Sequence, residues 1–207
     1  MAKAQLRYCR LMNKGRFESF SDGVFAFAIT LLILGIVLPA MSHPSERELR
    51  SALFSLWPNF IAFALSFAVI GIMWQNHHAL FRFVGKIDRK TVGWNLVLLA
   101  GTVVIPFATS TLGMYPTMHA SAFFYGLVLT WCSTAYNLML VHLIRSDAFE
   151  VLVTPERVRR TVTAYRVGWA TYAGATLLAL VLPLLSFAAY ILIAFYYFIP
   201  RGVDADA

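Results

Sequence analysis

Asp22 and His77 are the side chains of this sequence best suited to proton or ion chemistry. Asp22 stands just before residues 23–38, a run without charge, and a carboxylate that faces lipid is costly, so we expect it to have a partner or a function. Trp74, His77 and Asn95 can donate hydrogen bonds to Asp22 if their segments meet at one depth. We favour a structural clamp that joins three helices. A site that responds to protons or ions is the alternative.

Metal and enzyme chemistry have little support in the sequence. His77 and His78 are adjacent, so on a helix they point about 100° apart and rarely bind one ion, and no HxxxH spacing accompanies them. Cys9 and Cys132 are expected to be ordinary thiols. No GxSxG, P-loop or HExxH motif is present. We therefore expect no enzyme, no metal and no cofactor.

The composition is that of a chain that crosses a membrane several times. Of the 207 residues 59% are apolar and only 13% are charged, and the mean hydropathy is +0.69. The net charge of +7 does not indicate a nucleic-acid partner, because the basic residues lie between apolar runs. The expected partner is a lipid bilayer, and the expected fold class is all-α.

We expect one transmembrane domain over residues 1–207, with a basic leader at 1–16 and six spans. Residues 41–50 and 77–90 are expected to be a polar link and a basic loop. The last apolar block is too long for one crossing, and Pro183 provides a break within it. The six spans are 17–38, 51–76, 91–112, 118–144, 161–181 and 184–199.

The distribution of basic residues predicts the orientation. All 17 Lys and Arg residues except Arg47 and Arg50 fall on one side of the predicted membrane. Positive loops face the cytoplasm, so both termini are expected to be cytoplasmic, in the cell's inner (plasma) membrane. The polar residues near Asp22, Trp74 and Asn95 then share the inner surface.

An apolar stripe follows the first predicted span. Phe27, Leu31, Leu34 and Leu38 recur at helical spacing, with Thr30 beside them. From the residues alone this stripe either lines a pore or packs against another helix.

Three segments resemble a known family of channels. Residues 16–26, RFESFSDGVFA, resemble the RxxxFSDGVFA signature of the prokaryotic relatives of the lysosomal potassium channel transmembrane protein 175. Residues 70–78, IGIMWQNHH, and residues 88–96 resemble that family's second and third helices. The similarity is strong over residues 16–113 and weak beyond.

This resemblance implies a homotetramer of six-helix subunits whose first helix lines a pore for monovalent cations, with potassium as the permeant ion. It implies a hydrophobic constriction at Phe27, Leu31 and Leu34 and a role in cation preference for Thr30, and the chain lacks the TVGYG filter of ordinary potassium channels. Phe27 replaces the family's usual aliphatic residue, and Gly35 stands where relatives often carry an acid. The resemblance also implies a packing network at the foot of the helix, formed by Arg16, Phe20, Ser21, Asp22, Trp74, His77 and Asn95.

Two other classes remain open at this stage. A proton-coupled cation transporter would use Asp22 and His77 as its titrating groups. A scaffold or an intramembrane enzyme that transports nothing is the other alternative.

Overall fold

The computed structural model describes residues 13–41, 45–150 and 154–198. Residues 1–12 of the predicted leader and Ile199, the predicted end of the sixth span, lie outside these residues. The described part is all-helical apart from one isolated β-bridge between Val84 and Phe149. Its elements are α2 (Lys14–Leu31), the 3-10 helix η1 (Leu32–Gly35), α3 (Glu46–Ser55), α4 (Trp57–Arg82), α5 (Arg89–Met114), α6 (His119–Arg145), α7 (Pro155–Leu178) and α8 (Pro183–Phe198).

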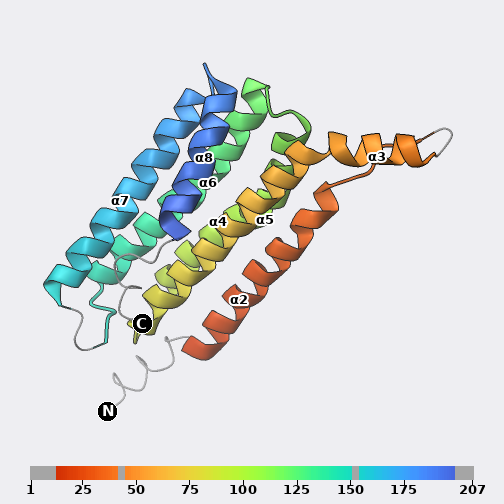
Figure 1. The fold of residues 1–207 in the computed structure, drawn as a ribbon. Helices are drawn as coiled ribbons and strands as arrows, with labels where there is room; N and C mark the ends of the chain where they lie inside the picture. Colours follow the sequence, from red (N-terminus) through yellow and green to blue (C-terminus); the bar gives the residue numbers. More distant parts are fainter. Residues whose placement is uncertain (1–12, 42–44, 151–153, 199–207) are drawn as a thin grey trace, which may run out of the picture.

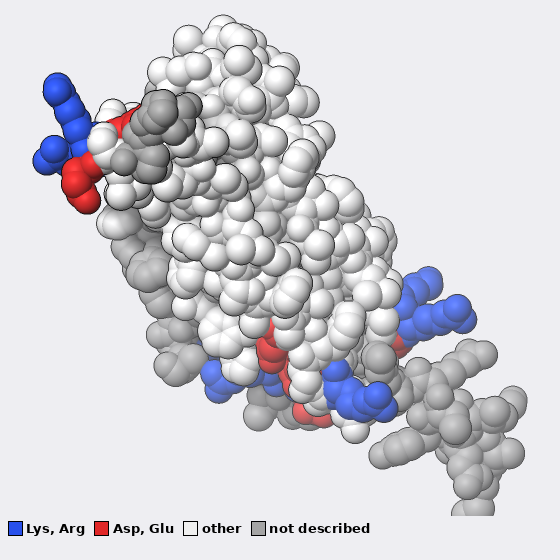
Figure 2. All heavy atoms as spheres, turned by 90° about the vertical axis from the view of Figure 1, so that its right-hand side faces the viewer, with Lys and Arg blue, Asp and Glu red and all other residues white. Residues whose placement is uncertain are grey.

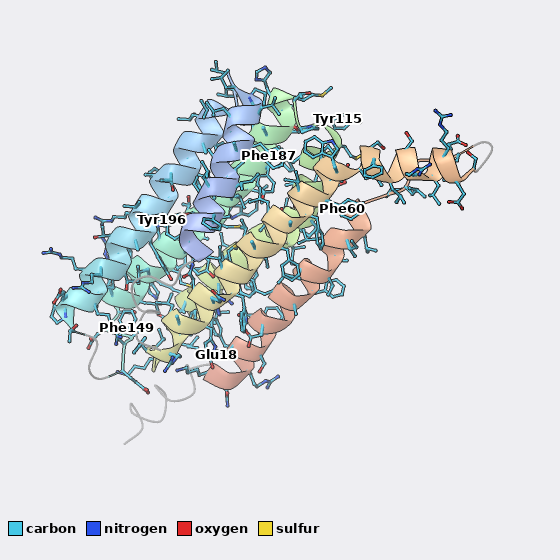
Figure 3. The ribbon with its side chains drawn as sticks, viewed as in Figure 1. Glu18, Phe60, Tyr115, Phe149, Phe187 and Tyr196 are labelled. Atoms are coloured by element: carbon cyan, nitrogen blue, oxygen red, sulfur yellow. The ribbon has the colours of Figure 1, made fainter. Side chains whose placement is uncertain are left out.

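The long helices form a bundle with α2 along one edge and α7 and α8 along the opposite edge (Figure 1). Helix α2 packs against α4 and α5, whereas α3 projects sideways from the start of α4 (Figure 1). Glu18 and Phe149 lie at one end of the bundle, and Tyr115 lies at the other (Figure 3). We call the end with Glu18 and Phe149 the basic end, because the basic starts of α5 and α7 and the basic last turns of α4 and α6 meet there.

Side-chain caps explain where four helices begin. Asn13, Ser45, Asp88 and Thr154 precede α2, α3, α5 and α7, and each side chain accepts a hydrogen bond from the backbone N–H three residues on. These bonds satisfy N–H groups that have no partner within the helix. Pro155 at the first position of α7 adds to this start signal, because its ring fixes a helical φ.

The first predicted span is not one continuous helix. The α-helix ends at Leu31, tightens into η1 and becomes extended at Ile36. Two local causes fit this ending. A Cβ on Gly35 would lie 3.1 Å from the Cβ of Ser110, so the chain approaches α5 closely there, and the residue before Pro39 is biased away from the helical region.

Two predicted loops are helical instead. Part of the polar link forms α3, since Ser45 caps it and Glu46 and Glu48 lie in its first turn, where the helix dipole favours negative charge. The first residues of the predicted basic loop are the last turns of α4, which continues to Arg82. His77 and Phe81 are buried there, so tertiary packing extends the helix beyond the end of its apolar run.

Four helical segments of the described chain are long and apolar enough to cross a membrane: Lys14–Gly35, Trp57–Arg82, Arg89–Met114 and His119–Arg145. Helix α7 starts with several arginines and α8 has only 16 residues, so these two fall outside that group. In the view of Figure 2, Lys, Arg, Asp and Glu gather at the two ends and leave an uncharged surface between them. This pattern suits a protein embedded in a bilayer.

Candidate functional site

One face of α2 is buried against α4 and α5. Phe17, Ser21, Phe25, Ala28 and Leu32 follow each other at intervals of three or four residues, and all are buried. Residues at this spacing share one side of a helix. The sequence therefore sets the rotation of α2 about its own axis.

A chain of buried hydrogen bonds fixes this face to both neighbours. The Asn95 Nδ2 of α5 donates to Ser21 Oγ at 2.9 Å, and Ser21 Oγ donates to the Phe17 carbonyl at 3.0 Å. The amide oxygen of Asn95 lies 3.0 Å from His77 Nε2, so the imidazole of α4 is the donor in that pair. Ser21, His77 and Asn95 are each at most 1% exposed. We call these three residues the anchor.

Phenyl rings enclose the imidazole of the anchor. The ring centroid of His77 lies 4.5 Å from that of Phe81, 5.5 Å from that of Phe25 and 6.0 Å from that of Phe17. These phenylalanines are not among the site residues expected from the sequence. The spacing Phe17–Ser21–Phe25 was the available signal for two of them, because it places them on the face that carries Ser21.

Asp22 makes a separate contact beside the anchor. Its Oδ1 accepts a hydrogen bond of 2.9 Å from Trp74 Nε1, and the indole of Trp74 stacks against the ring of His78. Of the three donors expected for Asp22, only Trp74 reaches it, because His77 and Asn95 bind each other. The carboxylate and the buried imidazole thus belong to two different contacts.

Arg16 and Phe20 do not join either contact within the described subunit. Both side chains are exposed, Phe20 by 56%. They lie four residues apart on a face of α2 that turns away from α4 and α5. Among the described residues, the hydrogen bonds of the expected network are those of the anchor and of the Asp22–Trp74 pair, and the roles of Arg16 and Phe20 stay predictions.

The opposite face of α2 and η1 is apolar and uncovered in the described chain. Phe27 is 65% exposed and Leu34 is 69% exposed, while Leu31 is half-buried. Thr30 is exposed too, and its hydroxyl donates to the carbonyl of Phe27 at 2.8 Å within the same helix. Three of the four residues expected at a constriction or beside it are therefore free of the chain's own core.

A second polar group ties the basic end of the bundle together. Asp88 Oδ1 accepts bonds from the backbone N–H and the hydroxyl of Thr91 at 2.8 and 2.7 Å, and it lies 3.0 Å from His142 Nε2 of α6. Burial works to raise the pKa of Asp88, but the bonds from Thr91 and His142 outweigh it and hold the pKa below its usual value. Nothing in the sequence pairs Asp88 with His142, which lies 54 positions later.

The described residues contain no group of three or more His, Cys, Asp or Glu side chains placed to hold a metal ion. The arrangement instead presents a helix that is locked on one side and bare on the other, which is suited to lining a path or an interface.

Comparison with known proteins agrees with this description. The family described as "Endosomal/lysosomal potassium channel TMEM175" matches residues 16–106. A potassium channel of Streptomyces collinus is 39% identical over 192 residues, which cover 90% of this chain and 92% of the relative. A potassium channel of Chamaesiphon minutus is 36% identical, with 88% and 92% covered. The similarity therefore extends well past residue 113, further than the motifs indicate.

Two further relatives extend the comparison. The crystal structure of a lysosomal potassium-selective channel TMEM175 homolog from Chamaesiphon minutus superposes with a TM-score of 0.78 at 34% identity, covering 89% of this chain and 95% of that one. The human "Endosomal/lysosomal proton channel TMEM175" is 38% identical over 103 residues, 47% of this chain and 20% of the human protein. With two relatives above 30% identity matched along nearly their whole length and one fold shared with a solved homolog, the chain belongs to the TMEM175 family.

Proposed function

We propose that this chain is a subunit of a potassium-permeable cation channel whose pore is lined by α2. Two relatives that it matches over 92% of their length are named potassium channels, and the solved structure is described as a homolog of the lysosomal potassium-selective channel TMEM175. The observation that carries the proposal is the two-sided character of α2: the anchor fixes one face, and the opposite apolar face is left bare.

Phe27, Leu31 and Leu34 form the proposed hydrophobic constriction. From Phe27 to Leu34 the chain covers about 10 Å along a helix axis, enough for several layers of apolar side chains. A narrow passage of this kind excludes ions by dewetting until it widens. Thr30 adds hydroxyls beside it, and the sequence contains no TVGYG segment to act as a carbonyl filter.

One subunit cannot enclose a pore, because α2 lies at the edge of its bundle (Figure 1). We propose a homotetramer in which four copies of α2 surround a common axis, with six spans per subunit when α7 and α8 are included. Both termini are proposed to be cytoplasmic in the plasma membrane, since the basic end collects most of the positive charge. The channel needs no cofactor, and its ligands are monovalent cations.

Proton permeation is the second candidate, because the vertebrate relatives are named proton channels. Strict proton coupling through Asp22 and His77 has less support. Asp22 is bonded to Trp74, and His77 is enclosed by phenyl rings and bonded to Asn95.

The test is ion flux into liposomes that contain the purified protein. Wild type should pass potassium down its gradient without a proton gradient, and Phe27→Ser or Leu31→Ser should raise the basal flux because a polar side chain wets the constriction. Phe195→Ser is the matched control: Phe195 is 72% exposed but lies on α8, at the other edge of the bundle.

Three results would count against the proposal. Absence of potassium flux would contradict the channel proposal. Flux that requires a proton gradient would favour a proton-coupled transporter. An equal rise of the basal flux in Phe195→Ser and Phe27→Ser would show that the bare face of α2 has no specific role in permeation. A pH-sensitive dye inside the same liposomes reports whether protons pass as well.

A further inference from the structure

A basic groove opens between the first turns of α7 and the end of α8. It has a volume of about 390 Å³, and Arg159 and Arg160 line one part of it while Val167, Tyr196 and Tyr197 line another. In Figure 3, Tyr196 lies at the lower end of α8, on the side of the bundle away from α2. The groove therefore faces outward, away from the proposed pore.

Among the residues that line the groove, the two arginines lie toward the end of the bundle and Val167 lies farther from it. The hydroxyl of Tyr197 donates to the carbonyl of Ala164 at 3.3 Å, which sets the level at which the last residues of α8 meet α7. Arg160 lies one turn before Ala164, about 6 Å nearer the basic end. Val167 lies on the other side of that level and is exposed. Two guanidinium groups thus lie nearer the basic end than the aromatic and aliphatic side chains of the groove.

The positive charge of the groove is only weakly neutralised. Arg160 pairs with Glu156 at 2.6 Å, but both side chains are more than 70% exposed, and such a pair holds its partner loosely. Arg159 makes no ion pair within the described part of the chain. Arg166 lies on the same side of α7 as Arg159, two helical turns away, and is exposed.

Arginines next to an apolar surface, at the level where a bilayer becomes polar, match the layout of a phospholipid. A phosphodiester accepts the guanidinium hydrogen bonds, and the acyl chains attached to it need an apolar surface. The cytoplasmic leaflet is negatively charged, and basic pockets between helices on that side suit anionic headgroups.

We propose that this groove binds the headgroup of an anionic phospholipid of the inner leaflet, with an acyl chain along Val167 and the outer face of α8. The proposal depends on the membrane orientation given above but not on ion permeation.

Native mass spectrometry of the purified oligomer in detergent, titrated with phosphatidylglycerol or phosphatidylcholine, tests this site. Wild type should bind phosphatidylglycerol in preference to phosphatidylcholine. The double variant Arg159→Gln, Arg160→Gln should weaken the tightest phosphatidylglycerol binding about 25-fold, at about fivefold for each arginine near a membrane surface. Inorganic phosphate at the same concentration should not compete, because it lacks the acyl chains.

The matched control removes two arginines from the opposite end of the bundle. Arg47→Gln, Arg50→Gln on α3 has the same change in net charge and should keep the tight phosphatidylglycerol site. Equal weakening in both double variants would overturn the proposal in favour of general charge attraction.

Two other outcomes also overturn the proposal. One is a wild-type protein that binds both headgroups equally well. A preference that appears only after Asp204 and Asp206 are replaced counts as the same result; these two acids follow α8 in the sequence. The other is competition by inorganic phosphate, which would mean a plain anion site. Potassium flux measured on the same variants keeps the two proposals apart, because loss of the lipid site leaves the face of α2 unchanged.

Discussion

The anchor of α2 makes the sharpest prediction from this structure. Asn95→Leu replaces the amide with an apolar side chain of similar size, so it removes both hydrogen bonds of Asn95 with little change in volume. Ser21 and His77 lose one partner each. Because these bonds join three helices, their loss should loosen α2 from the rest of the subunit.

The two losses differ in size. Ser21 still donates to the carbonyl of Phe17, so it loses only an accepted bond, worth about 0.6 kcal/mol in membrane proteins. His77 Nε2–H is left buried without the acceptor it had, which costs about 1–3 kcal/mol. Asn95→Leu should therefore lower the free energy of unfolding by about 2–4 kcal/mol. Ser21→Ala leaves the buried Asn95 Nδ2 without its acceptor and should lower it by about 1–3 kcal/mol.

The measurement is reversible unfolding of the detergent-solubilised protein, followed by tryptophan fluorescence. Thr30→Val is the control on the same helix, because its hydroxyl bonds only to the backbone of α2 and its side chain is exposed. It should change the free energy of unfolding by no more than about 0.5 kcal/mol. Ser21→Ala added to Asn95→Leu should cost almost nothing more, since their shared bond is already gone.

Two results would refute this reasoning. If Asn95→Leu is neutral or stabilising, apolar packing alone holds α2 in place, and the buried hydrogen bonds do not contribute to the free energy of unfolding. If the costs of Ser21→Ala and Asn95→Leu are simply additive, the two side chains do not act through a common bond.

Two further predictions concern the rest of the bundle. A Cβ on Gly126 would lie 1.9 Å from the hydroxyl oxygen of Tyr190, so Gly126→Ala should cost about 1–3 kcal/mol in the same unfolding assay, whereas Gly174→Ala, with open space around it, should not destabilise. The folded pKa of Asp88 is lower than its unfolded value, so its stabilisation is present above the ordinary carboxyl pKa and is lost as the pH falls through the folded value. The melting temperature of wild type should therefore drop on acidification below about pH 4, while Asp88→Asn should start lower at neutral pH and change less; equal acid slopes would contradict this.

The sequence predicts the bundle well where apolar runs are long. Helix α5 extends two residues past each end of the expected span 91–112, and both ends of α6 lie within one residue of the expected span 118–144, because length and hydropathy suffice to place them. It also predicts that Asp22 and Trp74 reach the same depth. It does not predict α3, although Ser45 and the acidic residues of the first turn are a helix-start signal in the sequence. Nor does it predict the early end of α2, which depends on the approach of Gly35 to Ser110.

The pairing of polar groups within the site is beyond sequence reasoning. The sequence offers Asp22 three donors, and only the rotation of α4 and α5 about their axes decides that Trp74 reaches it while His77 turns toward Asn95. His142 and Asp88 meet for the same reason, across the packing of α5 on α6. Rotation is set by the sum of many apolar contacts, and no single motif encodes it.

The anchor and the bare face of α2 are two consequences of one helical period. Phe25 and Phe27 are two positions apart, about 200° around the helix, so burying Phe25 against His77 forces Phe27 outward. A rotation that covered Phe27 would pull Ser21 away from Asn95 and expose a buried imidazole. The polar anchor therefore keeps the apolar face uncovered. A permeation phenotype in anchor variants would follow from rotation of α2 rather than from any change in the residues of the proposed constriction. Asn95→Leu should then alter potassium flux although Asn95 lies on α5, on the buried side of α2, whereas Thr30→Val, beside Phe27, should change flux without changing stability.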